Sequence, residues 1–205
     1  MSDPDPAGEI RHAGPGRPST GARERILEAA LETLKAEGYA GTTLAKVAAR
    51  AGENKALVSY HFGSKQGLIA AAAREIGEQI TAGVLAGVEG ATTVEEVLRR
   101  SVDAVWGILE RDARIARAYF DLNAVSVVED EVRIVLREVK ARWREVLVRL
   151  LRDAGVRARD VHQSALLATA TIEGFCLEWI ERGDTPELRE ARELFVRSIV
   201  AGLKA

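Results

Sequence analysis

Apolar side chains recur at intervals of three and four residues along most of this chain, and this spacing is the feature that most limits its fold. Near the start of the pattern, Ile26, Ala30 and Leu34 stand at every fourth position, with Leu27 and Leu31 beside them. Residues at this spacing cover one side of an α-helix, whereas a half-buried strand needs strict alternation. Runs rich in Ile, Thr and aromatic residues are missing from the sequence. The sequence therefore predicts an all-α fold.

Glycine and capping residues divide the pattern into about nine helices. Thr43 and Asn54 are suited to accept hydrogen bonds from first-turn amides, and Thr93 opens a capping-box spacing. Gly38 and Gly52 follow apolar runs and indicate helix ends. The expected helices span residues 26–37, 43–51, 54–62, 65–87, 94–111, 113–122, 131–154, 160–181 and 186–203.

The first twenty residues differ from the rest, and we expect a flexible arm over residues 1–20. They hold four of the five prolines and have no apolar periodicity. They also lack the apolar core of a secretory signal, and no stretch of the chain approaches the roughly 18 apolar residues of a membrane span. The single cysteine, Cys176, excludes an internal disulfide and fits a small core residue in a reducing compartment. We therefore expect a cytoplasmic protein without a membrane partner.

Positive charge is concentrated in one segment, although the net charge of the whole chain is only −2. Residues 38–74 carry a net charge of +4, so the other residues sum to −6. Glu53 is the only acid of this segment, whose cations are Lys46, Arg50, Lys55, Lys65 and Arg74. This asymmetry indicates a surface that faces a polyanion. A charged face that contacts only solvent is the alternative.

Two short helices joined by a tight glycine turn lie in the same segment, and they have the dimensions of a helix-turn-helix. The second of them begins with Lys55, and a helix N-terminus and a lysine both attract phosphate oxygens. Tyr60 and His61 stand at its far end, and Lys65 stands at the start of the next helix. An ordinary helical hairpin is the alternative interpretation.

These residues resemble the DNA-binding domain of the TetR family, in order and in spacing, over about a quarter of the chain. The matching residues are Gly38-Tyr39, Thr42-Thr43-Leu44, Val47-Ala48, Ala51-Gly52, Tyr60-His61-Phe62, Ser64-Lys65 and Leu68. The resemblance implies a three-helix helix-turn-helix domain over residues 21–67. A connecting helix would join it to a larger helical ligand-binding and dimerisation domain over residues 68–205.

The resemblance also implies which residues contact DNA. By position these are Thr43, Lys55, Ala56, Leu57, Ser59, Tyr60, His61 and Lys65. Ala56 and Leu57 have no hydrogen-bonding side chain, so in the major groove they can only read thymine methyl groups or tolerate close approach.

Three residues depart from the family pattern. Ala56 replaces a frequent Gly, and Ser59 replaces a frequent Tyr. Glu53 stands where a small apolar residue is common, and DNA would repel its charge unless it turns away or pairs with Lys55 or Arg50.

In the arm, Arg17 lies in a Gly-Arg-Pro sequence that suits a narrow minor groove, with a passive tail as the alternative.

Aromatic residues spread over the later helices predict a cavity for a small molecule, because such sites combine aromatic walls with a few polar groups. The candidate ligand-binding residues are Trp106, Tyr119, Phe120, Asn123, Trp143, Glu173 and Phe175. Core or dimer packing is the alternative for the aromatic residues, and a backbone partner or helix cap is the alternative for the polar ones. The effector itself is not identified by the sequence.

The last two helices resemble, in place and length, the pair that forms the TetR dimer interface. They carry apolar residues at three- and four-residue steps, and an exposed stripe of this size would be unusual in a monomer. Its members are Ala168, Thr171, Phe175, Trp179, Leu188, Ala191, Phe195 and Ile199. We therefore expect a homodimer through the last two helices, which would present two reading helices one or more DNA turns apart.

Together these features predict a DNA-binding transcriptional regulator, a repressor that a small molecule releases from operator DNA by moving the connecting helix. We expect no enzymatic activity, because no phosphate loop, nucleophile elbow or Ser/His/Asp set is present. We also expect no cofactor and no metal, because His and Cys residues do not recur in clusters. The alternative is a helical small-molecule-binding protein, or a co-regulator without sequence-specific DNA binding.

Overall fold

The computed structural model describes residues 21–204, and this part of the chain contains nine α-helices and no strand. The all-α prediction is therefore confirmed for the described residues, whereas the expected arm and Arg17 lie outside them. Within residues 21–204, no helix is both long and apolar enough to cross a membrane. The helices are α1 (Ala22–Gly41), α2 (Leu44–Ala51), α3 (Lys55–Phe62), α4 (Lys65–Gly87), α5 (Val94–Arg111), α6 (Ala113–Val125), α7 (Asp130–Asp153), α8 (Ala158–Arg182) and α9 (Pro186–Lys204).

Side-chain caps set the beginnings of the short helices as the sequence predicts. The Thr43 hydroxyl accepts from the Lys46 N–H at 3.2 Å, and Asn54 Oδ1 accepts from the Leu57 N–H at 2.8 Å. Thr93 at the start of α5 forms the expected capping box with Glu96. Each cap satisfies an amide that has no partner within its own helix. Local sequence is therefore sufficient to fix where α2, α3 and α5 begin.

Gly38 interrupts α1 rather than ending it. Its φ of 68° and ψ of −176° lie in a region that glycine alone adopts readily, and the helix continues beyond it to Gly41. A Cβ at this position would lie 2.8 Å from Oδ2 of Asp121 in α6. Glycine therefore allows the end of α1 to pack closely against α6.

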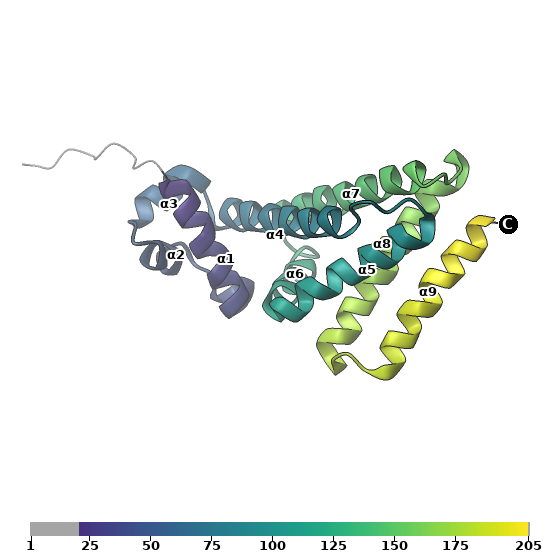
Figure 1. The fold of residues 1–205 in the computed structure, drawn as a ribbon. Coiled ribbons are helices and arrows are strands. Elements are labelled where there is room, and N and C mark those ends of the chain that lie inside the picture. Colours follow the sequence, from purple (N-terminus) through teal and green to yellow (C-terminus); the bar gives the residue numbers. More distant parts are fainter. Residues whose placement is uncertain (1–20, 205) are drawn as a thin grey trace, which may run out of the picture.

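Three apolar cores follow one another along the molecule. The first lies among α1, α2, α3 and the start of α4, and its fully buried members include Ile26, Val47 and Leu68. The second joins α1 to α4, α6 and α7, and the third packs α5–α9 together. Figure 1 shows α1–α3 at one end, α8 and α9 at the other, and α4 running beside α7 between them. The middle core therefore connects the two ends of the molecule.

The expected dimer stripe on α8 and α9 is not exposed, so that part of the prediction was wrong. Ala168, Leu188, Phe195 and Ile199 are buried in the third core, and Phe175 and Trp179 pack against it. Periodicity identifies an apolar helix face but does not say which neighbour covers it, and here the neighbours belong to the same chain. Other apolar side chains on the same helices are exposed, namely Leu166, Leu167, Leu177 and Leu194.

Candidate DNA-binding surface and ligand cavity

Helix α3 presents its N-terminal end and one side outward. Lys55 and Ala56 are exposed, and 74% of the Tyr60 surface is exposed to solvent. Val58 is completely buried and Leu57 packs against the same core, so these two residues anchor the helix. The outward residues of α3 are therefore held on a fixed base.

Most of the other predicted DNA contacts are partly buried or already have a partner within the chain. Ser59 and His61 are partly buried, and His61 Nε2 has no hydrogen-bond partner among the described residues. The Lys65 ammonium lies 4.1 Å from the centre of the Tyr39 ring, a cation–π contact. Thr43 is exposed, although its hydroxyl already caps α2. Of the predicted contacts, Thr43, Lys55, Ala56 and Tyr60 are thus exposed, and Leu57, Ser59, His61 and Lys65 are partly buried.

Ion pairs reduce the positive charge that this end of the molecule offers to DNA. Lys46 pairs with Glu37, and Arg74 pairs with Glu138. Within residues 21–204, Arg50 and Lys55 form no ion pair with a carboxylate. Among the Lys and Arg residues of α2 and α3, these are therefore the two that no carboxylate within residues 21–204 neutralises.

Glu53, the acid expected to oppose DNA, forms no ion pair with Lys55 or Arg50 within residues 21–204. Its carboxylate pairs with Arg25 of α1, and 14% of its side-chain surface is exposed. The expected partners were Lys55 or Arg50, whereas the observed partner stands 28 positions earlier in the chain. No sequence signal had pointed to Arg25.

A cavity of about 110 Å³ lies among α4, α5, α6, α7 and α8. Four of the predicted ligand-binding residues line it: Tyr119, Phe120, Trp143 and Glu173. Most of the remaining wall consists of Ile, Leu, Val and Ala side chains from all five helices. The surface that a ligand would meet is therefore almost wholly apolar.

Three predicted ligand-binding residues lie outside this wall. Trp106 donates its indole N–H to Asp184 at 3.3 Å and stacks against Arg192. Phe175 packs against the Phe195 ring, and Asn123 donates its amide to the backbone oxygen of Tyr119 at 2.9 Å. Each of these side chains has the packing or backbone partner that the alternative interpretation describes.

Several wall residues were not predicted. Ser101, Thr81 and Thr169 contribute hydroxyl groups, and Cys176 contributes a buried thiol. Small residues at helix spacing carry no signal that distinguishes a cavity wall from an ordinary core. Their role becomes visible only when five helices are brought together.

The polar groups of the wall are neutral or internally compensated. Tyr119 donates its hydroxyl to Glu173 Oε1 at 2.8 Å, and Lys140 Nζ binds Glu173 Oε2 at 3.1 Å. Burial raises the pKa of the Tyr119 hydroxyl, and the negative charge of Glu173 raises it further. Burial also raises the pKa of the Cys176 thiol, to about 12. At neutral pH both groups are therefore protonated, and the Glu173–Lys140 pair carries no net charge.

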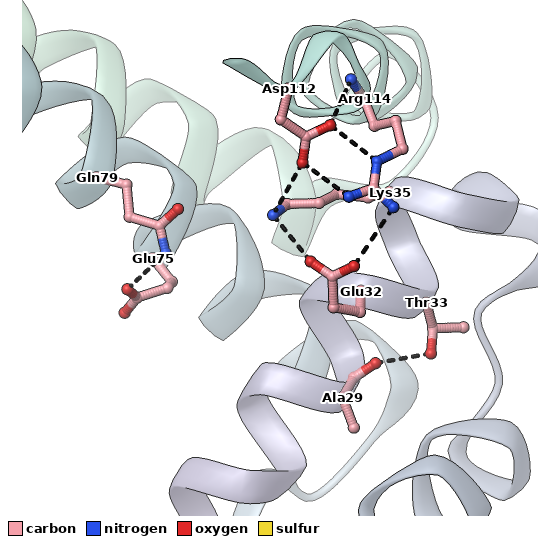
Figure 2. Close-up of polar contacts among 8 residues, drawn as sticks. All are labelled: Ala29, Glu32, Thr33, Lys35, Glu75, Gln79, Asp112 and Arg114. Atoms are coloured by element: carbon pink, nitrogen blue, oxygen red, sulfur yellow. Dashed lines mark hydrogen bonds and ion pairs between the residues drawn. The ribbon is translucent and has the colours of Figure 1, made fainter. Parts of the chain in front are cut away.

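Helix α6 connects this cavity to α1. Tyr119 and Phe120 face the cavity, and the next residue, Asp121, accepts a hydrogen bond from the Tyr39 N–H of α1 at 2.5 Å. At the other end of α6, Asp112 and Arg114 form a four-residue charge cluster with Glu32 and Lys35 of α1 (Figure 2). Lys35 Nζ lies 3.5 Å from Asp112 Oδ2, and Arg114 Nη1 lies 3.4 Å from Glu32 Oε2.

Comparison with known families matches the chain in two places. The family described as "Bacterial regulatory proteins, tetR family" matches residues 26–72. The family described as "BetI-type transcriptional repressor, C-terminal" matches residues 94–204, more than half of the chain.

Individual relatives agree with these family matches. The HTH-type transcriptional regulator BetI 1 of Chromohalobacter salexigens is 28% identical over 125 residues, which span 59% of this chain and 60% of that protein. The HTH-type transcriptional activator FasR of Mycolicibacterium smegmatis is 27% identical over 171 residues, or 80% of this chain and 76% of FasR.

A solved structure extends the likeness to the three-dimensional fold. The crystal structure of a TetR-family regulator from Rhodococcus sp. superposes with a TM-score of 0.75 at 25% identity, covering 90% of this chain and 99% of that one. The chain therefore belongs to the TetR family of DNA-binding transcriptional regulators, which are not enzymes, and carries a BetI-type C-terminal domain.

Proposed function

We propose that this protein is a homodimeric repressor that leaves its operator when a small molecule binds the cavity. One observation carries the proposal: two of the helices that line the cavity, α4 and α6, are also the helices of the later domain that pack against α1. A repressing rather than activating role is supported by the match to the BetI-type repressor C-terminal family.

Helix α4 offers the first route from cavity to DNA. Its first turns carry Leu68 in the core of the helix-turn-helix, and Ile80, Thr81 and Val84 further along line the cavity. A ligand that displaces the later turns of α4 would tilt the domain attached to its start.

Helix α6 offers a second route. Ile115, Ala116, Tyr119 and Phe120 line the cavity, while the Asp121 carboxylate holds the backbone of α1. A ligand shifts DNA affinity only by the difference in its affinity for the two arrangements, so it must fit the cavity of the released state better.

A second copy of this chain is the proposed occupant of the exposed face of α8 and α9. Leu166, Leu167, Ala170, Gly174 and Leu177 lie within one side of α8 and are exposed. Leu194 on α9 is also exposed, so both helices contribute apolar surface. A two-fold axis through this face would bury the leucines and pair two reading helices.

Sedimentation velocity tests the dimer. We expect the wild-type protein to sediment as a dimer and Leu167→Lys to sediment as a monomer, because the substitution places a charge in the buried interface. Ile134→Lys on α7 is the matched control, since Ile134 is also exposed and lies off the proposed face. A dimer that tolerates Leu167→Lys as well as it tolerates Ile134→Lys contradicts this interface.

A salt-titrated gel shift with DNA flanking the protein's own gene tests operator binding. Lys55→Ala is expected to weaken binding and to reduce the salt slope by about one, because one phosphate contact releases about one counterion. The control is Arg137→Ala, which removes an exposed charge from α7. Equal effects of the two variants, or no binding at low salt, would refute the proposal and favour a binding protein that does not read DNA.

A further inference from the structure

The hydroxyl and indole groups of the cavity wall are satisfied by the chain itself, with one exception. The hydroxyls of Thr81 and Thr169 donate to backbone oxygens at 2.8 Å and 3.0 Å, and the Trp143 indole donates to the Gly77 oxygen at 3.2 Å. Ser101 also lines the cavity, and only 4% of its surface is exposed. Its hydroxyl oxygen has no hydrogen-bond partner within residues 21–204.

An unsatisfied buried hydroxyl is uncommon in native proteins and calls for an explanation. It loses its hydrogen bonds to water on burial and receives nothing in exchange. A ligand group that donates to it or accepts from it restores this bond. A site of this kind also discriminates against analogues that lack the group.

Two features of the wall that would attract a cation, the Glu173 carboxylate and the Tyr119 ring, already interact with Lys140. The Lys140 ammonium binds the Glu173 carboxylate at 3.1 Å and lies 5.8 Å from the centre of the Tyr119 ring. An external cation would have to displace Lys140 from both groups. The carboxylate and the aromatic face therefore serve an internal ion pair.

An anion is disfavoured by the same arrangement. Among the residues that the structure describes, Glu173 is the only charged one in the cavity wall, and it is acidic. Lys140 lies beside the wall and is already neutralised by Glu173. A carboxylate or phosphate group would meet an apolar wall without a free cation, and burying an unpaired charge is costly.

We infer that the cavity takes an uncharged, largely apolar molecule with one hydrogen-bonding group, and that this group meets the Ser101 hydroxyl. The inference deepens the proposed function, because it names the chemical class of the effector for that same cavity.

Isothermal titration calorimetry of the full chain without DNA tests the class. The probes are 1-octanol, octylammonium and octanoate, which share one alkyl chain and differ in the charge of the polar end. We expect octanol to bind at least about tenfold more tightly than either ion, because neither ion finds a free partner in the wall.

Two substitutions test the assigned groups. Ser101→Ala is expected to weaken octanol binding by about 2- to 10-fold, the range for one neutral hydrogen bond. Its control, Thr169→Val, removes a hydroxyl that is already satisfied and is expected to change binding less. Lys140→Met frees the Glu173 carboxylate and should shift the preference toward octylammonium.

Absence of octanol binding, or octylammonium or octanoate binding as tightly as octanol, would overturn the inference. Equal effects of Ser101→Ala and Thr169→Val would overturn the role of Ser101. These results are separable from the proposed function, because they are measured without DNA. A protein that binds octanol but no DNA refutes the repressor proposal alone, and one that binds DNA but prefers octylammonium refutes the effector class alone.

Discussion

The two ends of this molecule collect their functional residues in different ways. The DNA-binding end presents Lys55, Ala56 and Tyr60 from the single helix α3, which is fixed by the Asn54 cap and the buried Val58. The cavity collects its wall from five helices, from Ile80 to Cys176. A surface built from one helix depends on local sequence, whereas a cavity depends on how distant helices pack. Substitutions should therefore act locally at the first end and spread across helices at the second.

The largest expected effect is on core stability, and it tests whether the two ends are independent. Leu68→Ala in the first core and Leu151→Ala in the third each remove a fully buried side chain, at a cost of about 2–5 kcal/mol. All three tryptophans lie in α5, α7 and α8, so their fluorescence reports the later domain alone.

Urea unfolding followed by fluorescence and by far-UV circular dichroism separates the two variants. Leu151→Ala is expected to lower the fluorescence midpoint more than Leu68→Ala does. Leu68→Ala should shift mainly the circular dichroism transition. Identical shifts of both signals in both variants would show that the molecule unfolds as one unit.

Gly38→Ala is expected to have the next largest effect, because it disturbs the contact between the two ends. The backbone at Gly38 is adopted readily only by glycine, and the new Cβ would press on Asp121, so we expect a loss of about 1–3 kcal/mol. Gly52→Ala is the control, since Gly52 also has a positive φ but, among the described residues, no atom within 4 Å of the place that a Cβ would take. Thermal unfolding should show that Gly38→Ala is the more destabilising variant. The reverse order would show that the close packing of α1 against α6 does not contribute to stability.

Asn54 separates the stability of α3 from its contact with DNA. Asn54→Ala removes the cap and should cost about 1 kcal/mol. Asn54→Asp keeps a capping oxygen and should preserve stability, but it adds a negative charge beside the proposed phosphate contact of Lys55. Unfolding and gel-shift measurements should therefore show weaker DNA binding in a stable protein. Unchanged DNA affinity of Asn54→Asp would place the N-terminus of α3 away from DNA.

The smallest expected effect concerns the charge cluster between α1 and α6. Hydrogen bonds from Arg114 hold the pKa of Asp112 below its usual value. A carboxyl with a lowered folded-state pKa contributes stability above its unfolded pKa of about 4, and this contribution is lost as the pH falls through the folded value. Because the cluster is partly exposed, the contribution should be below about 1 kcal/mol. In Asp112→Asn, the free energy of unfolding should therefore fall slightly less than in the wild type as the pH drops below ~4. Equal losses of unfolding free energy in the two proteins would contradict this.

The difference between the ends also explains what the sequence predicts. The Thr43 and Asn54 caps and the apolar periodicity are local features of the sequence. The helices, including α3, therefore follow from the sequence directly. The stripe on α8 and α9 was placed on the wrong face, because periodicity does not reveal which side meets the other helices of the same chain. Ser101 and the Arg25–Glu53 pair depend on residues far apart in the chain, and no local pattern marks them.

The account depends most on coupling between the cavity and the reading helix, and a cavity-filling substitution measures this without knowledge of the effector. Val105 lines the cavity from α5, and Val105→Phe would occupy part of the space that a ligand takes. Fluorescence anisotropy with operator DNA should show binding weakened by about 5- to 150-fold, the usual range of allosteric coupling, in a protein that keeps its helical content and its dimer. An unchanged dissociation constant in a folded dimeric variant would contradict the account.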